Sequence, residues 1–113
     1  MDDSILLTIK KLLGIGSDYD GFDMDLITHI NSIFLTLNQL AVGPENVFCI
    51  NSEKEKWKDF SIDTDIIGMV KTYIYIKVRI IFDPPASSFV LDAMNRMASE
   101  FEWRLNAQAE KQI

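Results

Sequence analysis

Hydrophobic residues return at intervals of three and four along much of this chain, as they do on the buried side of an amphipathic helix. The first such stretch begins after Ser4. Its apolar positions are Ile5, Leu6, Ile9, Leu12 and Leu13. Gly14 then stands where a left-handed C-terminal cap belongs, and Ile15 is placed to fold back on the helix. This pattern predicts a short helix that ends at Gly14.

A second stripe is the most regular one in the sequence. Its apolar positions are Leu26, Ile27, Ile30, Ile33, Phe34, Leu37, Leu40 and Ala41. Polar residues such as Asn31 and Asn38 occupy the other side. Pro44 ends the pattern, because the residue before a proline disfavours helical geometry. We therefore expect a helix from about Asp23 to Ala41.

The stretch from Glu45 to Thr64 has no helical stripe. It contains two short apolar patches, Val47 to Ile50 and Trp57 to Ile62, on either side of a charged tip. A loose hairpin and an ordered loop are both compatible with this pattern. Connections of this length are usually either functional or mobile.

The segment "KTYIYIKVRIIFDPP" (71–85) fits two periods. Its apolar and polar residues alternate as in a half-buried strand, yet from Asp65 onward they also satisfy the helical spacing. An uninterrupted stretch of roughly 17 residues, nearly all large and either apolar or amphipathic, is too long for a typical strand, whereas a central helix buried on most sides has this appearance. The length favours a helix that ends near Phe82, with Asp63 or Asp65 as its cap.

Asp83, Pro84 and Pro85 stop that helix and start the next one. Its apolar positions are Val90, Leu91, Met94, Met97, Ala98, Phe101 and Leu105. Arg96, Glu100 and Arg104 are spaced for ion pairs on its solvent side. This last helix runs from about Ala86 to Gln108. The fold class is mainly all-α, a small four-helix bundle with a long loop or short hairpin between its second and third helices.

Length and composition fit one soluble domain covering residues 1–113. The chain has 48% hydrophobic and 25% charged residues, the balance of an ordinary globular protein. Charges interrupt its apolar runs, so we expect no membrane span and no secretion signal. A formal net charge of -6 argues against a protein that binds nucleic acid mainly through phosphates.

The residues offer no constellation for catalysis, a metal or a cofactor. The acidic stretch from Asp18 to His29 fails the calcium-loop pattern at its glycine and at its final glutamate. With one cysteine and one histidine, a zinc site built on Cys and His is out of reach within one chain. Cys49 lies among apolar residues, where a thiol is typically a small buried hydrophobe. We therefore expect no enzyme activity.

Aromatic residues outside the helical stripes are candidates for binding. Trp57 and Phe60 lie in the charged, non-helical segment, and Trp103 sits slightly off the stripe of the last helix. Trp, Tyr and Arg dominate interface hot spots, so these side chains are possible anchors for a partner. The alternative is that each ring covers the edge of a small core.

Four segments together resemble the head-tail connector (adaptor) proteins of long-tailed phages and prophages of Gram-positive bacteria. They are "ILLTIKKLLGI", "FDMDLITHINSIFLTLNQLAVGP", "VKTYIYIKVRIIFDPP" and "MNRMASEFEWRLN". The resemblance covers nearly the whole chain and is weakest at Glu45 to Thr64. It implies a helical bundle that assembles into a ring of about a dozen copies beneath the portal. Such a ring extends the DNA channel and docks stopper or tail-completion proteins.

The resemblance also implies where the contacts lie. Subunit and portal contacts are expected in the loop at Glu45 to Thr64 and at the end of the last helix, around Trp103 to Lys111. The candidate interface residues are Phe48, Trp57, Phe60, Tyr75, Arg79, Trp103 and Arg104. DNA would pass through the channel without specific binding, and the protein would reside in the virion neck after assembly in the host cytoplasm. The alternative function is a small prophage regulatory or inhibitory protein that binds a host protein.

Overall fold

The computed structural model describes residues 3–110 and is built from helices. The five helices of this part of the chain are α1 (Ile5–Leu12), α2 (Asp23–Gln39), α3 (Trp57–Phe60), α4 (Thr64–Phe82) and α5 (Ser88–Glu110). The prediction of a mainly α-helical bundle is confirmed. The four longer helices match the four predicted stretches, and α3 adds a single short turn inside the long connection.

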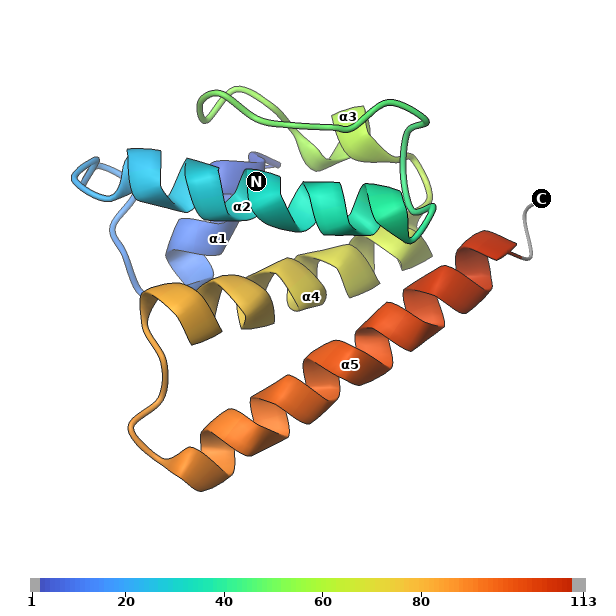
Figure 1. Cartoon of the computed structure of the whole chain (residues 1–113). Coiled ribbons are helices and arrows are strands. Elements are labelled where there is room, and N and C mark those ends of the chain that lie inside the picture. The colour runs from blue at the N-terminus through green and yellow to red at the C-terminus, as the bar shows by residue number, and fades with distance from the viewer. Residues whose placement is uncertain (1–2, 111–113) are drawn as a thin grey trace.

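The helices form a bundle with α4 at its centre. α1 and α2 pack on one side of α4, and α5 packs on the other side (Figure 1). α2 and α4 run in opposite directions, and α5 reverses again after the turn at 83–87. α4 therefore has neighbours on two sides, whereas α5 has α4 as its main support.

Hydrogen bonds cap both ends of α1, and the glycine cap at its C-terminal end was predicted. Ser4 accepts a hydrogen bond at its Oγ from the backbone N–H of Leu7, 3.2 Å away. At the other end Gly14 has φ 81°, and the Ile15 N–H donates to the Lys10 carbonyl at 2.9 Å. These bonds form the left-handed closing motif that the glycine indicated.

α2 closes in the same way but without a glycine. Ala41 has φ 64°, and the Val42 N–H donates to the Leu37 carbonyl at 2.9 Å. A Cβ crowds the backbone in this left-handed conformation, which is why glycine usually occupies it. The helix ends at Gln39, two residues before the predicted end at Ala41.

The segment that fitted both periods is a helix. α4 begins after Asp63, whose Oδ1 accepts hydrogen bonds from the backbone N–H groups of Asp65 and Ile66 at 3.0 and 3.3 Å. Its buried residues Tyr73, Ile74, Ile76 and Val78 point to more than one side of the helix. Because α4 is covered from both sides, its sequence lacked the clear polar face that distinguishes a helix from a strand.

The connection between α2 and α4 is an ordered loop and not a hairpin. It carries α3 and meets the N-terminus through one isolated antiparallel bridge between Ser4 and Lys56. The Asn31 side chain holds its first half: the amide accepts from the Ile50 N–H and donates to the Ile50 carbonyl, both at 2.8 Å. The loop therefore packs as part of the bundle.

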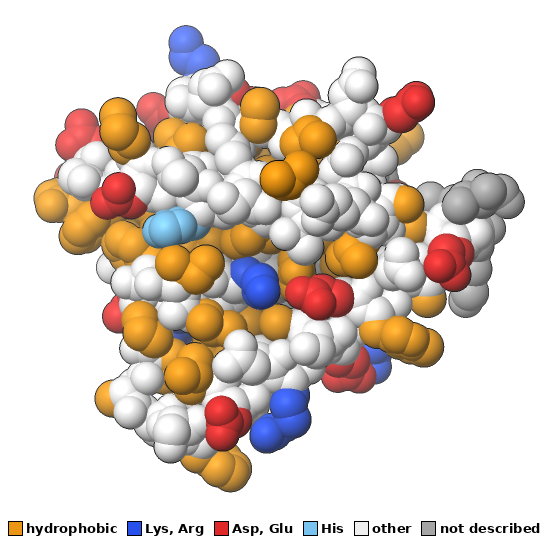
Figure 2. Space-filling view, in the orientation of Figure 1, with side chains coloured by type: hydrophobic (Ala, Val, Ile, Leu, Met, Phe, Trp, Pro, Cys, Tyr) orange, Lys and Arg blue, Asp and Glu red, His pale blue; other side chains and the backbone are white. Residues whose placement is uncertain are grey.

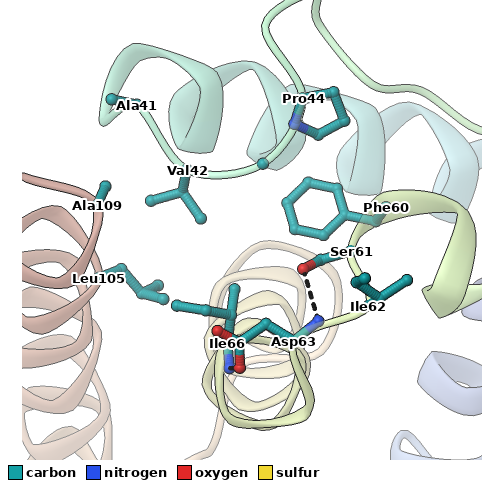
Figure 3. Close-up of a pocket in the computed structure, with 11 residues that line it drawn as sticks. Ala41, Val42, Pro44, Phe60, Ser61, Ile62, Asp63, Ile66, Leu105 and Ala109 are labelled. Atoms are coloured by element: carbon teal, nitrogen blue, oxygen red, sulfur yellow. Dashed lines mark hydrogen bonds between the residues drawn. The ribbon is translucent and has the colours of Figure 1, made fainter. Parts of the chain in front are cut away.

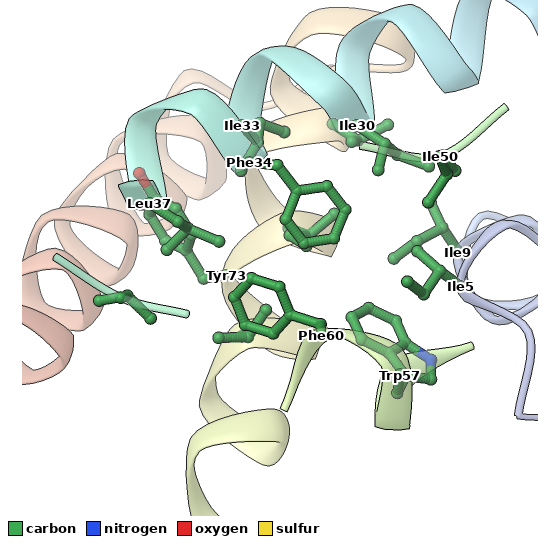
Figure 4. Close-up of a cluster of buried hydrophobic side chains, with 14 of the residues drawn as sticks. Ile5, Ile9, Ile30, Ile33, Phe34, Leu37, Ile50, Trp57, Phe60 and Tyr73 are labelled. Atoms are coloured by element: carbon green, nitrogen blue, oxygen red, sulfur yellow. The ribbon is translucent and has the colours of Figure 1, made fainter. Parts of the chain in front are cut away.

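Aromatic rings from α2 and this loop fill the core beneath it. Phe34, Phe48 and Phe60 form a cluster with ring centroids 5.0 to 5.5 Å apart. Trp57 lies beside them in Figure 4, and its Nε1 donates to Thr8 Oγ1 at 3.1 Å. Offset and edge-to-face packing of this kind adds to the area that the rings bury.

One buried charge was not expected from the sequence. Lys10 is 1% exposed, and its Nζ lies 2.8 Å from Asp23 Oδ1 and 2.6 Å from the Tyr19 carbonyl. The carboxylate and the carbonyl compensate an ammonium group that would otherwise be costly to bury. This contact fastens the turn at 13–22 over the end of α1.

Candidate interaction surface

Two of the expected interface residues lie in the core. Trp57 is 1% exposed and Phe60 is 5% exposed. The prediction that these rings are surface anchors is wrong for the isolated chain, and the alternative of rings at the core's edge is closer. α3 has one turn only, and this turn directs both rings inward against α1, α2 and α4 (Figure 4). Phe48 is half-buried on the same cluster.

Two further expected residues contact each other on α4. Arg79 Nη1 donates to the Tyr75 Oη at 2.9 Å, and both side chains are half-buried. The pair occupies adjacent turns of the helix, so it stiffens the surface of α4 locally. The ring contacts of Phe48 are with Phe34 and Phe60, and none joins it to Tyr75 in the described part of the chain.

The remaining two expected residues are exposed on α5. Trp103 is 73% exposed, and Arg104 forms an ion pair with Glu100 at 2.9 Å on the solvent side. The predicted pairing of these charges is confirmed. Lys111, at the end of the expected contact range, lies outside the described residues.

α5 exposes far more apolar surface than its stripe predicted. Only Ala98 and Leu105 are buried among its residues, while Phe89 is 76% exposed. The other exposed large hydrophobic side chains of α5 are Val90, Met97 and Trp103. We call the exposed residues of α5, from Phe89 to Glu110, its outer face. On the side shown in Figure 2, hydrophobic side chains gather between the C-terminal end of α4 and the N-terminal half of α5.

Polar contacts attach α5 to the bundle despite this exposure. The Tyr73 hydroxyl on α4 donates to Glu102 Oε2 at 2.6 Å, and Lys77 Nζ lies 3.9 Å from the same oxygen. Burial and the hydrogen bond to the Glu102 carboxylate raise the pKa of Tyr73 well above its usual range. Near the other end, the Asn106 amide donates to the Leu40 carbonyl at 3.0 Å. α5 is therefore held in one position while its outer face stays open.

A cavity of about 340 Å³ lies where the ends of α2, α4 and α5 meet (Figure 3). Val42, Phe60, Ile66 and Leu105 supply most of its apolar lining. The one carboxylate that residues 3–110 contribute to it, that of Asp63, already caps α4. This lining holds no pair of groups suited to acid–base or nucleophilic chemistry.

The expected burial of Cys49 needs a correction. Cys49 is exposed and not a buried hydrophobe, because Phe48 and Ile50 on either side of it point into the bundle. Among residues 3–110, no three His, Cys, Asp or Glu side chains are grouped closely enough to hold a metal ion. In the same part of the chain, no helix is both long and apolar enough to cross a membrane.

Comparison of the sequence with known protein families identifies the family of this chain. A family model described as phage connector protein matches residues 5–112. The chain belongs to this family. Searches of curated proteins and of solved structures found no match.

Membership of the connector family assigns this protein a general role in the phage particle. The match spans all five helices, so it includes the loop at Glu45 to Thr64, where the sequence resemblance was weakest. Connector proteins are structural components of the phage particle.

Sequence reasoning missed one prominent surface residue of this connector protein. Phe89 precedes the apolar stripe of α5 and was assigned no role, yet it is among the most exposed large side chains. Its position in the first turn after a proline pair was the available signal, because a large aromatic residue there has few neighbours within its own helix.

Proposed function

We propose that this protein is a head-tail connector subunit that forms a closed ring beneath the portal of a phage particle. The observation that carries the proposal is the family match over residues 5–112. The ring extends the DNA channel at the virion neck and docks stopper or tail-completion proteins on its far side. It assembles in the host cytoplasm from about a dozen copies of the chain.

The exposed apolar residues of α5 support self-association. Phe89 and Trp103 are 76% and 73% exposed, and Met97 lies between them. Monomeric proteins rarely leave several large apolar side chains exposed along one helix unless a partner covers them. Trp and Phe in such a position supply the anchors of an interface.

The charge of the chain suits a channel through which DNA moves. Seventeen acidic residues outweigh eleven basic ones. Carboxylates repel phosphate, so a ring with this composition lets the duplex pass instead of retaining it. The proposal therefore includes no specific DNA contact.

Negative-stain electron microscopy of the purified protein tests this function. We expect the images to show rings with an open centre. In a separate binding experiment, we expect a fluorescent DNA duplex to remain unbound by the protein at physiological salt. Particles that stay monomeric up to millimolar concentration would contradict the ring and favour a regulatory protein that binds a host factor. Tight binding of the duplex would contradict the passive channel.

A further inference from the structure

A groove runs along the side of the bundle opposite α5. Two hollows of about 530 and 410 Å³ lie there, and Lys71 on α4 lines both of them. Leu7 of α1 lines the first hollow, while Ile62 and Ile67 line the second. Ile62 is 90% exposed, so the groove has an apolar part that residues 3–110 leave uncovered. We call the two hollows together the α1–α4 groove.

A glycine forms part of the floor of this groove. Gly68 is exposed in the first half of α4, and a Cβ built on it would meet no atom within 4 Å. Glycine inside a helix destabilises it relative to alanine, and between residues 3 and 110 no positive φ or close contact requires a glycine at this position. A missing side chain does allow another backbone to approach closely.

The groove is basic in an otherwise acidic protein. Lys11, Lys58 and Lys71 line it, and Asp3 is its one acidic residue among the residues that the structure describes. Lys71 Nζ lies 5.5 Å from the centroid of the Trp57 ring, which holds this charge at the edge of the groove. Its occupant should therefore be apolar and carry a surplus of acidic groups.

The outer face of α5 has these properties. Its exposed apolar residues are flanked by Asp92, Glu100 and Glu110 against only Arg96 and Arg104. α5 and α1 lie on opposite sides of α4 (Figure 1). The two surfaces therefore face away from each other, so one chain cannot join them by itself, but consecutive copies can.

We propose that the α1–α4 groove of each subunit receives the outer face of α5 from a second copy of the chain. The inference rests on the proposed ring and names its contact. It is a helix-in-groove interface with Trp103 set against Ile62 and Ile67 and the open backbone at Gly68. Because two different surfaces meet, each subunit offers one of each, and copies joined in this way form a closed ring when the rotation between neighbours closes the circle.

A mixing experiment with two blocked variants tests this contact. Gly68→Leu fills the groove and leaves α5 intact, whereas Trp103→Glu disables the outer face and leaves the groove intact. Each variant alone should self-associate at least about thirtyfold more weakly than the wild type, the size of one hot-spot loss. Mixed in equal amounts they should form a dimer of about 26 kDa, twice the 12.9 kDa of one chain, and grow no further.

Matched controls show that the variants fold and that the sites are specific. Gly68→Leu should melt at a higher temperature than the wild type, because leucine favours the helix and meets open space. Lys71→Glu should weaken association, and Lys54→Glu, on the exposed loop tip away from the groove, should leave it unchanged. Met24→Glu places the same charge at an 81% exposed apolar residue on α2, and as the control for Trp103→Glu it should leave association unchanged.

The outcomes separate this contact from the ring itself. If Gly68→Leu and Trp103→Glu each form the same rings as the wild type, the groove contact is overturned and the proposed function stands. A mixture without the dimer would also overturn it. A wild-type protein that stays monomeric would overturn both. If Lys71→Glu abolishes binding of a DNA duplex and leaves association unchanged, the groove is a nucleic-acid surface and the inference is wrong.

Discussion

Trp57 is the largest side chain that the described part of the chain buries fully. Its ring packs in the core and its Nε1 donates to Thr8. We expect Trp57→Ala to lower the free energy of unfolding by about 3–5 kcal/mol, because the substitution removes the contacts and leaves a cavity. Urea unfolding followed by circular dichroism measures this loss.

Trp103→Ala is the matched control for that experiment. The same truncation at a 73% exposed position should change the free energy of unfolding of the monomer by no more than about 0.5 kcal/mol. Equal losses for the two variants would contradict the assignment of Trp57 to the core and Trp103 to the surface.

Ala41 offers a gain in stability. Its φ of 64° belongs to the left-handed region, where alanine is strained and glycine is not. We expect Ala41→Gly to raise the free energy of unfolding by about 1 kcal/mol. The opposite change is expected for Ala107→Gly inside α5, where glycine costs helix stability. A lower free energy of unfolding for Ala41→Gly would contradict the claim that the backbone at Ala41 is strained.

The exposure of some candidate residues could be predicted from the local sequence, whereas the burial of others depends on contacts with residues far away in the chain. Trp57 and Phe60 stand beside charged residues in a segment without a helical period, so the sequence indicated surface and core about equally. Their burial comes from Asn31 and the Ser4–Lys56 bridge, which fasten the loop across the bundle. Contacts between residues far apart in the sequence leave no local pattern. Trp103 lay off the stripe of its own helix, which was a local signal, and its exposure follows that signal.

At the scale of elements, the joint between α4 and α5 depends on pH. The pKa of Tyr73 is raised in the folded protein by burial and by Glu102. The unfolded chain therefore releases this proton near pH 10, while the fold retains it. The stability contributed by Tyr73 should be complete below that pH and be lost as the pH rises beyond it.

Tyr73→Phe tests this dependence. The variant should lose stability less steeply than the wild type above about pH 10, because its ring carries no ionisable hydroxyl. Tyr19→Phe, at a 52% exposed position, should keep the wild-type slope. Thermal unfolding across the alkaline range measures how steeply stability falls with pH. Identical slopes for wild type and Tyr73→Phe would contradict the claim that the Tyr73 hydroxyl makes the contact between α4 and α5 depend on pH.

Helix positions were the most predictable part of the fold. α1, α2 and α4 follow their apolar periods, and Gly14 and Asp63 form the caps that the sequence predicted. α5 begins at Ser88 and not near Ala86, because Ser87 Oγ accepts the Val90 N–H and starts the helix after the prolines. The long loop was the least predictable element, since α3 is too short to show a period.

At the scale of the whole molecule, the bundle presents two unlike surfaces on opposite sides. One is the outer face of α5, and the other is the α1–α4 groove with its three lysines. A four-helix pattern could be predicted from the sequence, but the opposition of these surfaces could not. It depends on which sides of α4 its neighbours occupy, and Lys11, Lys58 and Lys71 come from three different helices or their flanks.

The central claim is that this connector protein closes into a ring through α5. Native mass spectrometry of the wild type and of Trp103→Glu, at matched concentrations, tests it most directly. We expect one closed species of about a dozen subunits for the wild type and single chains of 12.9 kDa for the variant. Monomers from both proteins, or the same closed species from both, would contradict the account.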